Sequence, residues 1–183
     1  MRVITGTARG RRLKTTPGLD TRPTTDKVKE SIFNIIQFDI EGRRVLDLFA
    51  GCGQMGIEAL SRGAEHCTFV ELRRDASAVV RENLAVCQLE AQGSVKQMDA
   101  PAYLQSCREK FDLVFLDPPY KGELLAQALN LITLIDIVSE HGIIVCEISS
   151  EGKRPKLAEP YAIVKEYKYG KTTILRIERN AQA

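Results

Sequence analysis

The sequence predicts an α/β fold in which a mostly parallel, seven-stranded sheet has helices on both faces and ends in an antiparallel hairpin. Between residues 45 and 148, five short apolar runs alternate with segments of helical spacing. Continuous apolar strands buried between helices are typical of a parallel sheet. After residue 160, two strand-like runs flank Gly170-Lys171, which predicts a hairpin with a two-residue turn.

The first expected element is a basic extension over residues 1–24, in which runs 2–5 and 13–15 pair as a small β-hairpin around glycines. Residues 25–183 should form the α/β core, which begins with a helix over 26–38 that Thr24 or Thr25 caps. The remaining strands are expected at 45–48, 67–71, 95–98, 113–116, 143–148, 162–169 and 172–177, and the helices at 56–62, 75–86, 102–108 and 124–138.

Length and composition are those of an ordinary globular protein. The 183 residues are 44% hydrophobic and 27% charged, which predicts one domain over residues 1–183 with a sizeable core. No apolar run approaches the roughly 18 residues of a membrane span, and the N-terminus has no signal-peptide core, so we expect a cytoplasmic protein with no membrane contact. The five cysteines are odd in number and widely spaced, which predicts reduced thiols and no metal site.

Positive charge is concentrated at the N-terminus. Residues 1–29 contain eight Lys or Arg and two Asp, whereas the whole chain has a net charge of +2. A basic arm on a slightly acidic body favours a polyanionic partner that binds through the arm. The expected phosphate contacts are Arg9, Arg11, Arg12 and Lys14.

The segment 45–56 reads Val-Leu-Asp-Leu-Phe-Ala-Gly-Cys-Gly-Gln-Met-Gly, which predicts a strand, a glycine turn and a helix. The glycines at 51, 53 and 56 also match the dinucleotide-binding fingerprint, with Glu71 at the distance of a ribose-binding acid. Asp47, inside the strand, favours a different ligand. A carboxylate there suits an ammonium and a sulfonium, and it would repel a pyrophosphate.

Two further acids follow strands. Glu71 ends the expected strand 67–71, and Asp99 comes just after 95–98. Ligands of open parallel sheets bind beyond the carboxyl ends of the strands, so both acids should face the crevice that contains the glycine turn.

The motif Asp117-Pro118-Pro119-Tyr120 follows the fourth expected strand. An amino group on a base has its lone pair delocalised into the ring, so methylation requires both N–H bonds to be held. The Asp117 carboxylate can accept one N–H and the Pro118 carbonyl the other, while Pro119 restricts the backbone of Pro118. Tyr120 offers a flat face on which a base can stack.

Together these motifs resemble a Rossmann-like class I S-adenosylmethionine-dependent methyltransferase. The resemblance extends to the bacterial 16S ribosomal RNA guanine-N2 methyltransferase family through Arg2-Val3-Ile4-x-Gly6, Gly10-Arg11-x-Leu13, Arg22-Pro23-Thr24, 30–34 and 56–64. It implies methylation of one guanine in 16S rRNA, within the small subunit or an assembly intermediate, by a protein expected to be a monomer.

The same resemblance implies roles for particular residues. Glu71 would bind the ribose hydroxyls and Asp99 the adenine amino group, while Arg22-Pro23-Thr24 would close over the cofactor and Arg22 would also contact RNA. Asp117, Pro118, Pro119 and Tyr120 would be catalytic. The cofactor-binding set implied is Asp47, Phe49, Ala50, Gly51, Cys52, Gly53, Gly56, Glu71, Leu72, Asp99, Ala100 and Thr24.

The loop departs from the family pattern at three positions. Cys52 stands where Ser is expected, and Gln54-Met55 stands where small or apolar residues are usual. Cofactor binding should survive, because the loop acts mainly through its backbone. We hypothesise that Cys52 is accessible without cofactor and protected by it.

Other functions remain open at this point. An adenine-N6 methyltransferase acting on RNA or DNA could use the same tetrapeptide, whereas a glutamine-modifying protein methyltransferase usually has Asn in place of Asp117. A nicotinamide dehydrogenase would share the glycine pattern. A non-catalytic RNA-binding or nucleotide-binding protein could also have kept the fold.

Overall fold

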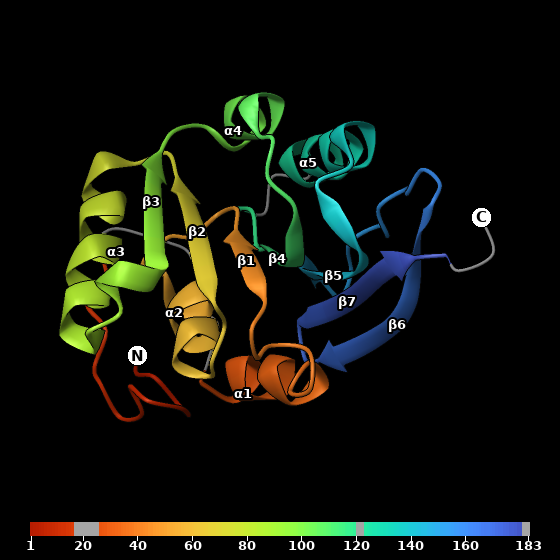
Figure 1. Cartoon of the computed structure of the whole chain (residues 1–183). Coiled ribbons are helices and arrows are strands. Elements are labelled where there is room, and N and C mark those ends of the chain that lie inside the picture. Colours follow the sequence, from red (N-terminus) through yellow and green to blue (C-terminus); the bar gives the residue numbers. More distant parts are fainter. Residues whose placement is uncertain (17–25, 120–122, 181–183) are drawn as a thin grey trace.

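The computed structural model describes residues 1–16, 26–119 and 123–180, and it contains the expected α/β sheet. The strand order is β3-β2-β1-β4-β5-β7-β6 (Figure 1). The strands are β1 (Arg44–Asp47), β2 (His66–Glu71), β3 (Gly93–Gln97), β4 (Phe111–Leu116), β5 (Val138–Ser149), β6 (Tyr161–Tyr169) and β7 (Thr172–Arg179). The first five pair in parallel, and β7 lies antiparallel between β5 and β6. The predicted fold class is confirmed.

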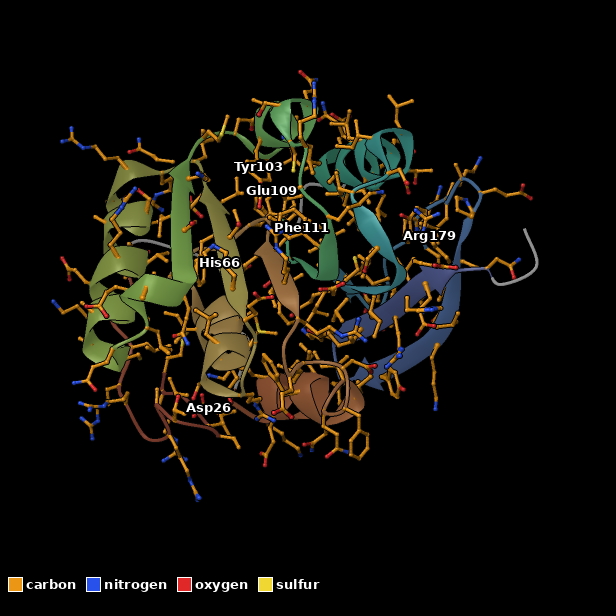
Figure 2. All side chains as sticks on the ribbon, viewed as in Figure 1. Asp26, His66, Tyr103, Glu109, Phe111 and Arg179 are labelled. Atoms are coloured by element: carbon orange, nitrogen blue, oxygen red, sulfur yellow. The ribbon has the colours of Figure 1, made fainter. Side chains whose placement is uncertain are left out.

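Helices cover both faces of this sheet. The helices are α1 (Asp26–Ile35), α2 (Gln54–Ser61), α3 (Arg74–Cys87), α4 (Ala100–Ser106) and α5 (Glu123–Ile135), with a 3-10 turn at Glu90–Gln92. Helices α1, α2 and α3 pack on one face, and α4 and α5 pack on the other (Figure 1). Strand side chains alternate between these two cores: in β4, Leu113 and Phe115 face the first, and Val114 and Leu116 the second. Tyr103 and Phe111, labelled in Figure 2, belong to the second core.

The prediction for residues 124–138 was wrong at its end. Helix α5 stops at Ile135, and β5 starts at Val138 instead of 143. Asp136 has a φ of 52°, a left-handed conformation in which short polar residues end helices. Ile137 and Val138 are buried, and an apolar run of this kind does not distinguish a buried strand from a helix by its periodicity.

The N-terminal segment also differs from the prediction. Its two expected strands reduce to one isolated antiparallel bridge between Arg2 and Arg12. The first expected helix ends at Ile35 and turns through Phe38. The segment is nevertheless ordered by contacts with the helices on which it lies.

Glu58 on α2 is a buried anchor for this segment. Its carboxylate accepts hydrogen bonds from the backbone N–H groups of Ile4 at 2.7 Å and Thr5 at 3.0 Å. It also lies 3.6 Å from Nζ of Lys29, which donates to the Arg2 carbonyl at 2.5 Å. The Lys29 and Glu58 side chains are both fully buried, and burial lowers the pKa of Lys29 while the Glu58 carboxylate opposes that change. These contacts therefore hold the N-terminal segment against α1 and α2.

Within the described part of the chain, no helix has the length and apolar character needed to cross a membrane.

Candidate functional site

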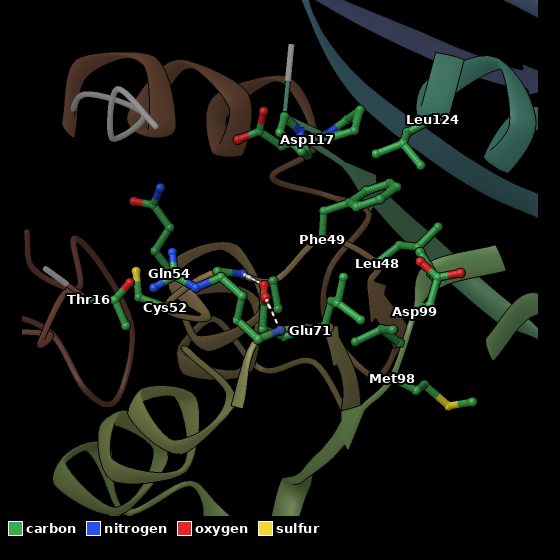
Figure 3. A pocket seen from close by; sticks show the side chains of 18 of the residues that line it. Thr16, Leu48, Phe49, Cys52, Gln54, Glu71, Met98, Asp99, Asp117 and Leu124 are labelled. Atoms are coloured by element: carbon green, nitrogen blue, oxygen red, sulfur yellow. Dashed lines mark hydrogen bonds between the residues drawn. The ribbon is translucent and has the colours of Figure 1, made fainter. Parts of the chain in front are cut away.

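A pocket of about 400 Å³ opens at the carboxyl ends of the parallel strands (Figure 3). The strand order reverses between β1 and β4, and such switch points are where open α/β sheets bind ligands. Of the implied cofactor-binding residues, those that line the pocket are Phe49, Ala50, Gly51, Cys52, Glu71, Leu72, Asp99 and Ala100. Sequence reasoning missed other lining residues, namely Met1, Thr15, Thr16, Leu48, Gln54, Val70, Arg73, Met98 and Leu124.

The three loop glycines serve different purposes. Gly51 has a φ of 55°, and a Cβ added there would meet nothing within 4 Å, so its backbone is open to a ligand. Gly53 also has a positive φ, of 80°, and a Cβ there would lie 3.0 Å from Val80. At Gly56 a Cβ would come within 2.3 Å of the Phe69 ring, because α2 crosses β2 closely. Gly53 and Gly56 shape the loop without lining the pocket.

Asp47 does not face the pocket, which corrects its expected role as a ligand-facing acid. Its side chain is 4% exposed, and Oδ2 accepts a hydrogen bond from the Gly56 N–H at 3.0 Å. Burial raises the pKa of Asp47 to about 7, and the Glu71 carboxylate adds to the rise. Asp47 therefore stabilises the start of α2 through its buried hydrogen bond to Gly56.

Glu71 lies in the pocket, at the end of β2. Its two carboxylate oxygens accept the Gly51 N–H at 2.9 Å and the Arg73 N–H at 2.8 Å, as the dashed lines in Figure 3 show. Each carboxylate oxygen can accept a further hydrogen bond. We call Glu71, Leu72, Met98 and Asp99 the strand-end wall, because they lie at or just beyond the ends of β2 and β3.

The other wall comes from the glycine loop and the N-terminal segment. Thr16, Cys52 and Gln54 line it, and we call them the loop wall. Asn83 on α3 is fully buried and joins the two segments. Its Nδ2 donates to the carbonyls of Lys14 at 3.0 Å and Cys52 at 2.9 Å, and its Oδ1 accepts the Lys14 N–H at 2.8 Å. Sequence reasoning missed Asn83, because a lone Asn within a helix gives no signal of its distant partners.

The hypothesis that Cys52 is accessible without ligand was wrong. The residue is 9% exposed, and its Sγ lies 3.5 Å from Sδ of Met1. Burial raises the pKa of the Cys52 thiol, which disfavours the reactive thiolate. All five cysteines are buried and free, so they form no disulfide.

Asp117, Pro118 and Pro119 line the pocket just after β4. The remaining residue of the motif, Tyr120, lies outside the described residues, as do Arg22 and Thr24.

The guanidinium-bearing residues Arg9, Arg11 and Arg12 of the basic arm are exposed, as is Arg2, whose Nε lies 3.6 Å from Oδ2 of Asp26. Lys14 differs from the first three, because its Nζ lies 2.7 Å from Oε2 of Glu82 and its charge is thereby balanced. Among residues 1–16, 26–119 and 123–180, no group of three or more His, Cys, Asp or Glu could hold a metal ion.

Comparison with known proteins identifies relatives over nearly the whole chain. The family model described as conserved hypothetical protein 95 matches residues 1–178. YlbH of Bacillus subtilis (strain 168), whose name assigns it provisionally as an rRNA methyltransferase, is 44% identical over 177 residues, covering 95% of this chain and 96% of YlbH. Ribosomal RNA small subunit methyltransferase D of Escherichia coli (strain K12) is 33% identical over 184 residues, covering 100% of this chain and 91% of that protein.

A solved structure agrees with these relationships. The Escherichia coli protein yhhF, named provisionally as a methyltransferase, has a TM-score of 0.91 and 30% identity, and the match covers 100% of this chain and 99% of that one. The chain therefore belongs to the conserved hypothetical protein 95 family and is related over its whole length to ribosomal RNA small subunit methyltransferase D.

Proposed function

We propose that this protein transfers a methyl group from S-adenosylmethionine to the exocyclic N2 amino group of a guanine in 16S rRNA. The substrate would be the small ribosomal subunit or an assembly intermediate, and the protein would act in the cytoplasm as a single-domain monomer. The observation that carries this proposal is the position of Asp117-Pro118-Pro119 on the pocket that contains the Gly51 turn and Glu71. The names of the relatives supply the choice of an rRNA substrate.

The pocket fits the proposed cofactor in size and in donor set. About 400 Å³ is within the usual range for small-molecule sites. Glu71 and Asp99 offer acceptors for ribose hydroxyls and for an adenine amino group, and Leu48, Phe49 and Met98 offer apolar surface for a purine. The open backbone at Gly51 permits close approach. When bound, S-adenosylmethionine would supply an electrophilic methyl group.

The chain's own residues would hold the amino group in position. The Asp117 carboxylate would accept one N–H, and the Pro118 carbonyl would accept the other, which favours a nitrogen whose lone pair is free to react. Tyr120 would stack on the base. In-line placement would provide most of the rate enhancement, and Asp117 would stabilise the positive charge that develops on nitrogen.

The exposed side chains of Arg9, Arg11 and Arg12 would contact RNA phosphates. Changing all three to Gln should weaken RNA binding and reduce the slope of log affinity against log salt by about 2–3, since each lost contact removes roughly 0.7–0.9. The measurement is fluorescence anisotropy with a 16S rRNA fragment across a salt series.

A matched control changes three exposed lysines elsewhere, Lys153, Lys156 and Lys168, to Gln. It should leave the salt slope nearly unchanged. Equal slopes for wild type and the arginine variant would refute the arm as the RNA contact.

Methyl transfer to undermethylated small subunits and to naked 16S rRNA, with nucleosides identified by mass spectrometry, tests the reaction. N2-methylguanosine that disappears with Asp117→Ala would support the proposal. N6-methyladenosine would favour the adenine-N6 alternative, whereas no product despite cofactor binding would favour a DNA or protein substrate. Binding of NAD in place of S-adenosylmethionine would favour an oxidoreductase.

A further inference from the structure

The loop wall holds two buried polar atoms that have no hydrogen-bond partner among the described residues. They are Oγ1 of Thr16 and Oε1 of Gln54. Thr16 is 6% exposed and Gln54 9% exposed, and both residues line the pocket. Buried polar groups are nearly always paired in folded proteins, so two orphans in one pocket indicate a polar ligand there.

The two walls differ in the hydrogen bonds that they can make. Glu71 and Asp99 on the strand-end wall are carboxylates, which accept but do not donate when ionised. The Thr16 hydroxyl and the Gln54 amide can each donate and accept. In Figure 3, Thr16 and Gln54 lie on one side of the pocket, Met98 and Asp99 lie on the other, and Glu71 lies between them.

The chemistry of the loop wall matches a zwitterion. An ammonium needs acceptors and a carboxylate needs donors, and this wall supplies both. Gln54 is also the first residue of α2, in whose first turn the Gly56 N–H is already bonded to Asp47. The partial positive charge of the helix N-terminus adds to the preference for a carboxylate.

We propose that Gln54 and Thr16 bind the α-amino and α-carboxylate groups of the cofactor's amino-acid end. The Gln54 carbonyl oxygen accepts from the ammonium, and the Thr16 hydroxyl donates to the carboxylate. The proposal rests on the proposed function, which it deepens by assigning each wall to one end of the cofactor. It gives a role to Gln54, one of the residues at which this loop departs from the family pattern.

Asn83 is the positioning residue for this subsite. By bonding to Lys14 and to the Cys52 carbonyl, it fixes the chain two residues before each member of the pair. Oγ1 of Thr16 and Oε1 of Gln54 make no hydrogen bond with the described residues, so both atoms are available to the ligand.

Calorimetric binding of two ligands to the full chain tests the proposal. S-adenosylhomocysteine carries the amino-acid end, whereas 5′-methylthioadenosine lacks it. Gln54→Met and Thr16→Val keep the side-chain size and remove the polar atoms. Each should weaken S-adenosylhomocysteine binding by about tenfold or more, as for hydrogen bonds to charged groups, and leave methylthioadenosine affinity unchanged.

Leu72→Ala on the strand-end wall is the control, and it should weaken both ligands by a similar factor. Unchanged S-adenosylhomocysteine affinity in both loop-wall variants would overturn the assignment. Equal losses for the two ligands would also overturn it, because that result indicates a distorted loop. If wild-type protein binds neither ligand, the proposed function itself fails.

Discussion

The strand-end wall and the loop wall of the pocket are assembled in different ways. Glu71 and Asp99 stand at the exits of adjacent parallel strands, so the sheet's own hydrogen bonds bring them to one edge. Thr16 and Cys52 are far apart in sequence. Asn83, on a third segment, donates hydrogen bonds to the carbonyls of Lys14 and Cys52 and so connects the two segments. A wall made by sheet topology should tolerate changes in side chains around it, whereas a wall made by a few buried polar contacts should not.

The largest effect is expected from Glu58→Ala, which removes a buried anchor of the N-terminal segment. The change would leave the buried Lys29 ammonium without its carboxylate, and the N–H groups of Ile4 and Thr5 without an acceptor. Removing one partner of a buried ion pair typically costs about 3–5 kcal/mol. The loss should appear as a lower free energy of unfolding in a urea titration.

Glu82→Ala is the matched control, because it also removes a carboxylate that binds this segment. Its partner Lys14 lies at 2.7 Å, but the two side chains are 64% and 52% exposed. An exposed pair contributes about 0.2–1 kcal/mol. Similar losses in the two variants would contradict the distinction between a buried anchor and a surface contact.

Asn83→Ala tests the junction of the loop wall itself. It leaves the Lys14 N–H, the Lys14 carbonyl and the Cys52 carbonyl without their side-chain partner. The bond to Cys52 is buried and the two to Lys14 are partly buried, so we expect a loss of about 1–3 kcal/mol in the free energy of unfolding. Ser77 is a control on the same helix, since it is equally buried but its hydroxyl bonds within α3, donating to the Arg74 carbonyl and accepting from Nη1 of Arg81. If Ser77→Ala lowered the free energy of unfolding as much as Asn83→Ala in the same urea titration, that result would contradict the role of Asn83 in joining the N-terminal segment to the glycine loop.

Alanine at Gly56 and at Gly51 should separate a packing glycine from a ligand-facing one. Gly56→Ala places Cβ against Phe69 and Cys67, and such overpacking costs about 1–3 kcal/mol of stability. Gly51→Ala meets no atom and suffers only from its positive φ, at about 1–2 kcal/mol, but its methyl group enters the pocket. We therefore expect calorimetry to show the larger loss of S-adenosylhomocysteine affinity for Gly51→Ala. The reverse order would contradict the roles assigned to the two glycines.

The smallest expected effect is the loss of folding stability when Asp47 ionises as pH rises. The folded protein raises the pKa of this acid from 3.8 to about 7, so it binds the proton more tightly than the unfolded chain does. Stability from this group is therefore fully present below about pH 4 and is lost as pH rises to about 7. Asp47→Asn cannot ionise, so wild type should lose about 1 kcal/mol more than the variant between about pH 6 and pH 8. Parallel urea-unfolding profiles at the two pH values would contradict a raised pKa.

The strand-end wall was predictable because parallel topology and residue type were enough to place Glu71 and Asp99. The same reasoning assigned Asp47 to the pocket and was wrong, because side chains alternate along a strand. Leu46 faces the core of α4 and α5, and Asp47 points to the opposite face, under α2. Position near a strand end therefore does not decide which way a side chain points.

The loop wall could not be predicted, because it depends on contacts between distant segments. No local pattern indicates that Asn83 would bind Lys14, or that Glu58 would receive the backbone of Ile4. Periodicity also gave no boundary at residues 135–138, where the chain changes from helix to strand at Asp136. These are places where tertiary packing decides between local alternatives.

A crystal structure of the protein with S-adenosylhomocysteine tests the assignment of the two walls most directly. We expect the adenosine against Glu71 and Asp99, the amino-acid end between Thr16 and Gln54, and the sulfur on the side of Asp117. A ligand that lies in the reverse direction, or outside this pocket, would contradict the account.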